Sequence, residues 1–405
     1  MSKMTSFERR GWGGLGVVST LVALSAMVGV DCTDANPPPA SSDDAASPSE
    51  DSALPPTGDT GADSQPTPDA GSDATVDGGN LPFDSGPLLD SGSDAANDVG
   101  APDAGPCTGT VLDSGACFVV LATGQDKPTG IAVVGSYVYW TNQGSSANSG
   151  SVNRVPISGI QYTVLAHNQD FTSGIAVDSN NAYWANEGDG IGLGSIMSVS
   201  LTDGGAPTVL ASGQTGPYFV ALDPDNVYFT TYGGGSVTDH IAMVAKTGSP
   251  DGGATELTAS NGPWGIVTDS NDVYWTDANF TYSLPLGAPG TPTEVTNAGT
   301  QGIALGGSNL FACTGTGLVI APKIDPTKAN TPVGTASQYL CWAVATDALN
   351  VYWSDDFENI WSMPQNGSTP QALYNSTLDR PMGIAVDALN VYWVTNTGKV
   401  LQISK

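Results

Sequence analysis

Basic residues and histidines are scarce in this sequence. Its 405 residues contain 11 lysines and arginines against 40 aspartates and glutamates, and only two histidines. Residues 107–405 alone carry 23 acidic and 8 basic residues, with no basic stripe. This shortage argues against nucleic acid as a partner, because binding to phosphates depends on clustered Lys and Arg. An acidic excess without clustering mainly favours solubility.

Long apolar runs are also absent, with one exception at the N-terminus. Lys3, Arg9 and Arg10 precede an uncharged stretch, residues 11–30, whose apolar centre is residues 15–30. A charged segment followed by a short apolar segment is typical of an export signal. No comparable run recurs, which excludes a polytopic membrane protein. We therefore expect residues 1–32 to be an export signal.

Cysteine is rare too, with five in the chain, and the first has a suggestive position. Cys32 stands where bacterial lipoprotein signals carry the cysteine that becomes acylated. Asp31 departs from the aliphatic and small residues usual in that box, so an unmodified Cys32, or its loss with the leader, stays an alternative. Acylation of Cys32 would leave four cysteines, an even number suited to disulfides in an oxidising compartment.

Residues 33–106 lack lysine and arginine entirely and have almost no large apolar side chain. They consist mainly of Asp, Ala, Pro, Ser, Gly and Thr, with 15 acidic residues. Such a segment cannot bury enough apolar surface to offset the entropy of ordering the chain. We predict a disordered acidic linker that holds a globular domain, residues 107–405, away from a membrane or cell wall.

What this domain does contain is one pattern repeated seven times. Each copy joins a GIAVD-like strand, a tight polar turn and a VYWT-like strand, and the copies begin at Gly130, Gly174, Phe219, Gly265, Gly302, Ala343 and Gly383. Their predicted aromatic anchors are Trp140, Trp184, Phe229, Trp275, Phe311, Trp353 and Trp393, spaced 36 to 46 residues apart. A period of roughly 40 to 45 residues is typical of a four-stranded propeller blade.

The remaining strands of each blade predict how the ring closes. In the VYWT strand, apolar residues occupy both faces, as expected for a strand between two neighbours in a propeller. The Asp-rich turns fit hairpins in which Asx side chains bond nearby backbone. Six outer strands follow the repeats, and the seventh is residues 118–122, ahead of the first repeat. We therefore predict an all-β, seven-bladed propeller whose N-terminal strand completes the last blade and removes an exposed edge.

The blade motif resembles the YWTD propellers of the low-density-lipoprotein-receptor class and, more loosely, bacterial NHL-like propellers. YWTD itself stands at residues 274–277, with YWTN from Tyr139, YWAN from Tyr183 and YWSD from Tyr352. The resemblance covers about residues 118–405 and differs in blade number, since the receptor rings have six blades. It implies a binding role without a catalytic centre, by analogy only.

Antiparallel pairing places the end of each second strand beside the start of each first strand, on one face near the channel. We predict ligand contacts on this rim from residues of two kinds. The aromatic Tyr218, Trp264 and Trp342 directly precede first strands, and Asp277 and Asp355 end second strands. Aromatic side chains at a concave rim are common binding anchors. The alternatives are that the aromatics pack over the channel and that the Asp side chains bond backbone at a neighbouring blade's entry.

The same geometry suggests disulfides. Cys313 and Cys341 lie on one face of adjacent blades, close to the roughly 5.5 Å Cα separation that a disulfide prefers. Cys107 and Cys117 would then pair and clamp the closing strand. Four buried or reduced thiols are the alternative.

Catalytic and metal chemistry have little support in the pattern. His167 and His240 lie at peripheral positions, and we find no pair of His and Glu on the inner rim. The groups Asp355, Asp356 and Glu358, and Glu187 and Asp189, contain oxygen ligands suited to calcium, but neither has a known loop spacing. We predict no cofactor and no metal.

The sequence therefore favours a monomeric binding module, secreted or tethered to the cell surface or outer membrane, that recognises a protein or a glycan. Contact with a membrane is expected only through the possible lipid on Cys32. The alternatives are a propeller enzyme of the lyase or hydrolase type acting at the channel mouth, or a structural component of the envelope.

Overall fold

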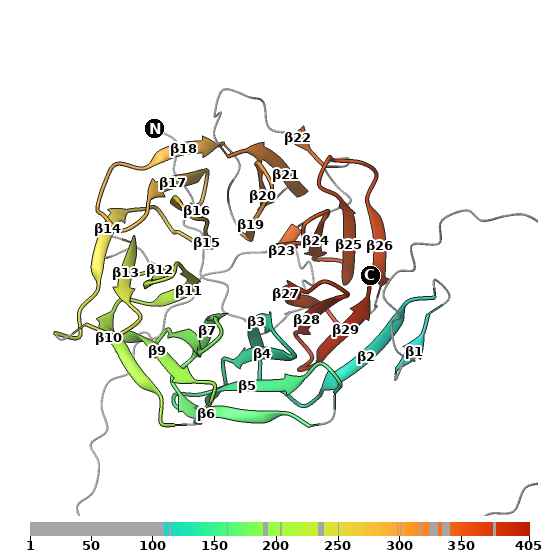
Figure 1. Ribbon diagram of the computed structural model, residues 1–405, viewed down its shortest axis with the longest axis horizontal. Coiled ribbons are helices and arrows are strands. Elements are labelled where there is room, and N and C mark those ends of the chain that lie inside the picture. The colour runs from blue at the N-terminus through green and yellow to red at the C-terminus, as the bar shows by residue number, and fades with distance from the viewer. Residues whose placement is uncertain are drawn as a thin grey trace, which may run out of the picture. The chain divides into compact units, whose positions relative to one another are not determined.

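Seven antiparallel sheets surround a central channel in the computed structural model (Figure 1). The structure describes residues 109–112, 115–159, 161–188, 193–202, 205–233, 239–249, 251–297, 299, 301–315, 317–323, 331–333, 341–375 and 378–405. Six sheets have four strands and the seventh has five. The predicted seven-bladed propeller is confirmed, and no helix occurs among the described residues.

The strands of each blade run outward from the channel in chain order. The first strands are β3 (Pro128–Val134), β7 (Thr172–Val177), β11 (Pro217–Leu222), β15 (Ile266–Thr268), β19 (Ile303–Gly306), β23 (Cys341–Thr346) and β27 (Pro381–Val386). The second strands are β4 (Tyr137–Asn142), β8 (Asn181–Asn186), β12 (Asn226–Thr231), β16 (Asp272–Thr276), β20 (Asn309–Thr314), β24 (Asn350–Asp355) and β28 (Asn390–Thr395). We number the blades 1 to 7 in this order.

The third and fourth strands form the outer half of each blade. The third strands are β5 (Gly150–Pro156), β9 (Gly194–Ser200), β13 (His240–Ala245), β17 (Thr281–Pro285), β21 (Gly317–Pro322), β25 (Asn359–Pro364) and β29 (Val400–Ser404). The outer strands of blades 1 to 6 are β6 (Thr163–Gln169), β10 (Thr208–Gln214), β14 (Thr255–Ala259), β18 (Thr293–Thr296), β22 (Thr331–Pro332) and β26 (Gln371–Asn375).

The N-terminal strand closes blade 7, as predicted. β2 (Cys117–Ala122) pairs antiparallel with β29, the last strand of the chain, with Phe118 opposite Ile403 (Figure 1). The ring of Phe118 stacks on Tyr374 of blade 6 at 5.1 Å between centroids. A short β1 (Thr110–Val111) adds a fifth strand that the sequence did not predict. Closure thus joins the two ends of the propeller sequence in one sheet.

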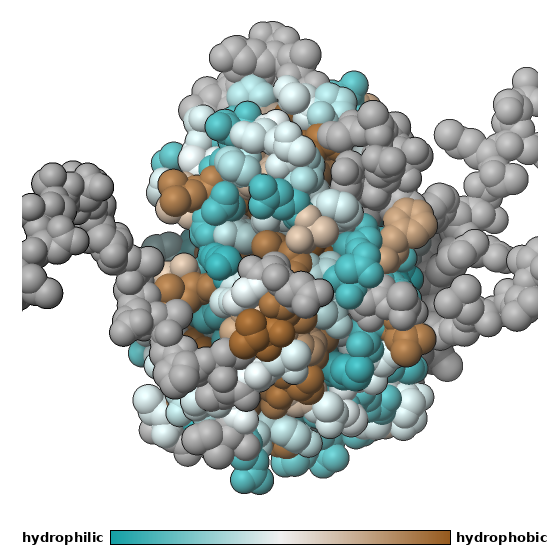
Figure 2. All heavy atoms as spheres, turned by 90° about the vertical axis from the view of Figure 1, so that its right-hand side faces the viewer, coloured by the Kyte–Doolittle hydropathy of each residue, from teal (hydrophilic) through white to brown (hydrophobic). Residues whose placement is uncertain are grey.

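The core consists of clusters between adjacent blades. Second strands are buried on both faces, and Trp140, Trp184, Trp275, Trp353 and Trp393 have no exposed surface. Figure 2 shows the side of the molecule that carries blade 7 and its edge strands, where apolar residues gather within a largely hydrophilic surface. Val111 and Val120 of those edge strands remain 60% and 46% exposed. The large apolar side chains are therefore mostly between blades and not on the surface.

One predicted anchor was assigned to the wrong register. In blade 7 Ile384 pairs with Trp393, whereas in blade 5 the equivalent Ile303 pairs with Ala312. Phe311 therefore occupies the position of the preceding tyrosine, and Ala312 replaces the tryptophan. Phe311 is the only aromatic residue in that copy, so aromatic character alone points to it, whereas pairing with the first strand puts Ala312 at the anchor position.

Candidate functional site

The channel is lined by the beginnings of the first strands. One residue per blade forms an apolar ring along its wall, and these are Ile131, Ile175, Val220, Ile266, Ile303, Val344 and Ile384. At one end the lining includes the residues that precede this ring, namely Thr129, Ser173, Tyr218, Trp264, Trp342 and Met382. We call this end the entry face. The open space has a volume of about 150 Å³, which suits one small apolar group rather than an enclosed drug-sized ligand.

Glycine at the start of the first strands allows the blades to approach closely at the channel. A Cβ atom on Gly130 would lie 2.8 Å from the carbonyl oxygen of Ser173 in the next blade. A Cβ atom on Gly383 would lie 2.7 Å from the carbonyl oxygen of Thr129. Any side chain here would force the blades apart, so glycine serves packing. Blade 3 departs from this pattern, because Phe219 occupies the glycine position.

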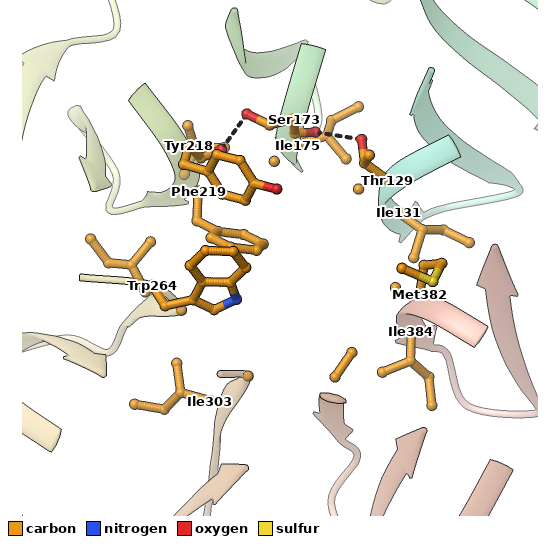
Figure 3. A pocket seen from close by; sticks show the side chains of 18 of the residues that line it. Thr129, Ile131, Ser173, Ile175, Tyr218, Phe219, Trp264, Ile303, Met382 and Ile384 are labelled. Carbon is orange, nitrogen blue, oxygen red and sulfur yellow. Dashed lines mark hydrogen bonds between the residues drawn. The ribbon is translucent and has the colours of Figure 1, made fainter. Parts of the chain in front are cut away.

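Three aromatic side chains form a contiguous cluster on one side of the mouth. The ring centroid of Tyr218 lies 4.9 Å from that of Phe219 and 4.9 Å from that of Trp264, and the Phe219 and Trp264 centroids lie 5.6 Å apart. In Figure 3 these rings project from blades 3 and 4 toward the open centre. Tyr218 is 9% exposed, whereas Phe219 and Trp264 are half-buried. Partial exposure leaves ring surface available to a ligand.

Trp342 of blade 6 lines the same mouth, but its ring contacts Arg380 and not the aromatic cluster. The guanidinium carbon of Arg380 lies 4.7 Å from the centroid of its ring, a cation–π geometry. Arg380 also forms an ion pair with Asp356. The structure therefore places the three predicted aromatics, Tyr218, Trp264 and Trp342, on one lining. The predicted ligand contacts did not include Phe219, Met382 or Arg380.

On the side of blades 1 and 2, Thr129 and Ser173 line the mouth and the buried Thr141 lies behind them, and their hydroxyls bond the neighbouring blade. The Thr141 hydroxyl lies 2.5 Å from the Ser173 carbonyl oxygen, to which it donates, and accepts the Gly130 N–H at 2.9 Å. The Ser173 hydroxyl donates to the Tyr218 carbonyl oxygen at 2.7 Å (Figure 3). These hydroxyls tie blade 1 to blade 2 and blade 2 to blade 3, so their role is structural.

The two predicted aspartates lie outside the channel lining. Asp355 is fully buried and accepts the backbone N–H groups of Phe357 and Asn359 and the indole N–H of Trp361. Asp277 is 5% exposed and accepts the N–H groups of Asn279 and Phe280. Their partners belong to the turn of their own blade and not to a neighbour's entry, since the side chain reaches the N–H groups two to four residues ahead.

The disulfide between Cys313 and Cys341 is confirmed, with a Cα–Cα distance of 4.9 Å. It joins blade 5 to the strand that leads into Trp342. Cys313 occupies the position that Thr141 has in blade 1, so a covalent bond stands where the hydroxyl bond joins those blades. Cys117 is also disulfide-bonded, while Cys107 and Cys32 lie outside the described residues.

Strongly shifted pKa values occur at the opposite end of the blades, which we call the turn face. Burial would raise the pKa of Asp347, but hydrogen bonds from the Lys405 ammonium, the backbone of Asn350 and Leu349, and Tyr352 outweigh it and hold the pKa at about 2. Burial, followed by the bond to Asp347, raises the pKa of Tyr352. Equivalent Asp–Tyr bonds recur in blades 2, 3, 4 and 7. Shifted pKa values often mark active sites, but this repetition shows a structural turn.

The chain's remaining candidates for catalysis or metal binding do not converge on the channel. His167 lies in β6 and His240 begins β13, both in outer halves of blades. Among the described residues no three His, Cys, Asp or Glu side chains cluster as metal ligands, and Asp189 lies outside those residues. The described channel lining contains no carboxylate, imidazole, amine or thiol. Its chemistry is apolar contact, aromatic stacking and a few neutral polar groups.

Comparison with models of protein families and with curated proteins finds no match to the chain. Among solved structures, it is similar to virginiamycin B lyase from Staphylococcus aureus, with 17% identity and a TM-score of 0.58 over 72% of this chain and 99% of that one. A catalytically inactive histidine-to-alanine variant of that lyase with quinupristin gives 18% identity and a TM-score of 0.57 over 72% and 99%.

The WD40 β-propeller domain of Doa1 is also similar, with 12% identity and a TM-score of 0.54 over 71% of this chain and 97% of that domain. At such low identities the likeness concerns the fold alone. No helix in the described part of the chain is long and apolar enough to cross a membrane. The chain is therefore a seven-bladed β-propeller, a fold that occurs in both enzymes and binding domains.

Proposed function

We propose that this protein is a binding module that recognises a protein or a glycan at the entry-face mouth of its channel. The observation that carries the proposal is the contiguous cluster of Tyr218, Phe219 and Trp264 beside an uncharged channel. Aromatic rings supply large, rigid contact area at little entropic cost, and recessed aromatics dominate many binding interfaces. The small channel volume favours a ligand that rests on the mouth and inserts one apolar group.

Binding is favoured over catalysis by the chemistry of the lining. General acid–base catalysis needs a group that takes up or releases a proton near neutral pH. The similar lyase is inactive when one of its histidines is replaced by alanine, whereas both histidines of this chain lie in the outer halves of their blades. The described lining of the mouth offers Tyr218 as its one ionisable side chain. The YWTD-like motifs agree with a binding role and support assigning the blades to that repeat type.

We also propose that the protein is exported and tethered through residues 1–106, with Cys32 acylated. The disulfide between Cys313 and Cys341 supports export, because disulfides persist mainly in oxidising compartments. One acyl chain anchors marginally and several anchor firmly. In cell fractionation, Cys32→Ser should move the full-length protein from the membrane to the soluble fraction. A wild-type protein that is already soluble would overturn the tether and leave the binding proposal untouched.

The binding proposal is tested with Trp264→Ala and Trp342→Ala in the full-length chain. Ligand capture from envelope extract and from a glycan array should fall for both variants, since loss of a true anchor costs at least about 2 kcal/mol. Val209→Ala is the matched control, because Val209 is a 52% exposed apolar residue on an outer strand. Lower melting temperatures with undiminished capture by the folded fraction would show that the aromatic residues are packing and that the ligand binds elsewhere.

A further inference from the structure

A second recess lies over blade 4, apart from the channel. It is lined by Ser260, Asn261, Trp275, Asp277 and Tyr282, together with Ala259 and Pro292, and has a volume of about 200 Å³. Trp275 is fully buried, and its ring stacks on that of Tyr282 at 5.7 Å. The recess is smaller than the roughly 300 to 1,000 Å³ typical of pockets for drug-sized ligands. It therefore fits a single side chain or a comparable group.

The recess coincides with a local departure from the repeat. In blade 1 the side-chain oxygen of Gln125 accepts the indole N–H of Trp140 at 3.0 Å and the amide N–H of Asn142 at 2.9 Å. Blade 2 repeats this arrangement with Gln169. In blade 4 the shorter Ser260 takes the glutamine's place and accepts the Trp275 indole N–H at 3.0 Å. The volume filled by a carboxamide in blades 1 and 2 is thus open in blade 4.

In blade 6 the equivalent aspartate, Asp355, has hydrogen-bond donors for both of its carboxylate oxygens. One carboxylate oxygen of Asp355 accepts two backbone N–H groups, and its Oδ2 accepts the Trp361 indole N–H at 2.7 Å and the Asn359 amide at 2.8 Å. Tyr282 stands in the register position of Trp361. A tyrosine in that position brings no N–H to the carboxylate.

Asp277 consequently has one oxygen left over. Its Oδ1 accepts the N–H groups of Asn279 and Phe280, both at 2.9 Å. No described residue donates a hydrogen bond to its Oδ2, although the side chain is 95% buried by its surroundings and lines the recess. This oxygen is not enclosed by protein, so it is open to a donor from another molecule at the recess. A charged donor would form the stronger hydrogen bond there.

The charge around the recess specifies a cationic donor. The carboxylates of Asp277 and Glu294 both lie near Tyr282, whose pKa is raised by burial and then by these two charges. The ion pairs of the described residues use other carboxylates, namely Asp178, Asp269, Asp347, Asp356 and Asp379. Asp277 is therefore not neutralised by any described lysine or arginine.

Two lysines elsewhere in this protein each contact an aspartate and a tyrosine ring. On the turn face the ammonium of Lys246 lies 2.9 Å from Asp178 and 5.4 Å from the ring centroid of Tyr183. Likewise, the ammonium of Lys405 forms an ion pair with Asp347 and lies 4.8 Å from the ring centroid of Tyr352. An aspartate beside a tyrosine ring thus holds a lysine twice within this fold. Asp277 and Tyr282 likewise place a carboxylate and a tyrosine ring in one recess, whereas on the turn face the tyrosine hydroxyl also donates to the aspartate.

We propose that the blade 4 recess binds a lysine side chain of a partner protein, whose ammonium group donates to Asp277 Oδ2 and lies against the Tyr282 ring. Ala259, Pro292 and the aromatic walls contact the methylene stem, which lysine buries while its charged end stays polar-bonded. Cation–π attraction adds to the charge-assisted hydrogen bond. The recess is separate from the channel mouth, so this inference goes beyond the proposed function and does not depend on it.

The test measures binding of Nα-acetyl-lysine methylamide to the full-length chain by calorimetry and by changes in tryptophan fluorescence. Nα-acetyl-norleucine methylamide is the uncharged probe of similar shape, and glucosamine presents the ammonium on a sugar. The lysine probe should bind saturably, the norleucine probe at least about tenfold more weakly, and added salt should weaken the binding. No saturable binding of the lysine probe, or equal binding of norleucine, would overturn the proposal. Tighter binding of glucosamine would also overturn it.

Three variants locate the binding. Asp277→Asn keeps an oxygen for the turn and should lower affinity at least about tenfold. Ser260→Gln rebuilds the glutamine of blades 1 and 2, and Tyr282→Trp rebuilds the donor of blade 6; both should abolish binding without lowering the melting temperature. Asp251→Asn removes an exposed carboxylate elsewhere and should change nothing. If Asp277→Asn fails to fold, the two rebuilding variants still decide, and unchanged binding in either would refute the site.

Discussion

The two sides of the channel mouth have the same backbone plan and opposite chemistry. On the side of blades 1 and 2, Gly130 and Gly174 allow close approach, and the hydroxyls of Thr141 and Ser173 bond the next blade. On the side of blades 3 and 4, Phe219 replaces the glycine and packs against Trp264. Blade 4 keeps the structural bond, because the Thr276 hydroxyl donates to the Gln301 carbonyl oxygen at 2.7 Å. The difference therefore lies in the aromatic rings that blades 3 and 4 add at the opening.

In a repeat protein, positions that depart from the repeat are the first candidates for function. Positions that follow the repeat are explained by blade-to-blade packing, since each blade needs the same contacts with its neighbours. Departures from the repeat are not required by the fold and therefore need another reason. Phe219 at the mouth, and Ser260 with Tyr282 in blade 4, are such departures.

The largest expected effect is the loss of stability when the closing strand is removed from blade 7, which adjoins blade 1. Deleting residues 107–122 from the full chain removes Phe118, Leu121 and Ala122 from the core and exposes the edge of β29. Losing large buried side chains costs about 2 to 5 kcal/mol each, so stability should fall by more than about 5 kcal/mol. Calorimetry and light scattering should show a large loss of melting temperature or aggregation. An unchanged melting curve from a monomer would contradict closure.

A smaller loss of stability is expected for Thr141→Val, which keeps the side-chain volume and removes one buried hydroxyl. The Gly130 N–H loses its partner, and the Ser173 carbonyl oxygen keeps only the Thr129 hydroxyl at 3.3 Å. One unsatisfied group costs about 1 to 3 kcal/mol, so urea unfolding should show a loss of that size, while capture by the folded fraction stays normal. Lost capture with unchanged stability would mean that this side also binds the ligand.

The role of the aromatic cluster in binding is tested by Phe219→Gly, which restores the glycine found at this position in blades 1, 2, 4, 5 and 7. The variant removes ring contacts with Tyr218 and Trp264, and such pairs contribute about 0.5 to 1.5 kcal/mol each beyond their buried area. Ligand affinity should fall by about 1 to 2 kcal/mol in a binding titration. If affinity is unchanged while the free energy of unfolding falls, the cluster belongs to the core.

The smallest expected effect is a loss of folding stability at low pH. Asp347 has its pKa lowered to about 2 by its hydrogen bonds, below the unfolded value of about 3.9. A lowered pKa stabilises the fold above the unfolded value, and this stabilisation is lost as the pH falls from about 4 to about 2. Denaturation followed against pH should show this loss, and Asp347→Asn should reduce it. Capture by the folded fraction should not follow this titration, because the described mouth lining has no carboxylate.

Much of the fold could be predicted from the sequence because propeller blades are local in the chain. Each GIAV and VYWT pair forms a hairpin whose strands are separated by a short turn, so residue spacing alone fixed their pairing. Closure by residues 118–122 followed from counting outer strands, and the disulfide between Cys313 and Cys341 from their place at adjacent blades. The anchor of the fifth copy was wrong because an aromatic residue was preferred to the register.

The site was less predictable, because it depends on contacts between blades. The blade count, the closing strand and the three aromatic residues on one rim follow from the repeat period and from the alternation along each strand. The contact of Phe219 with Tyr218 and Trp264 is visible only in the folded chain. The same holds for the hydrogen bonds that saturate Asp355 and for the carboxylate oxygen that Asp277 keeps open at a recess. The physical reason is that a hydrogen bond or a ring contact is set by distances of a few ångströms across blade boundaries, which repeat spacing does not specify.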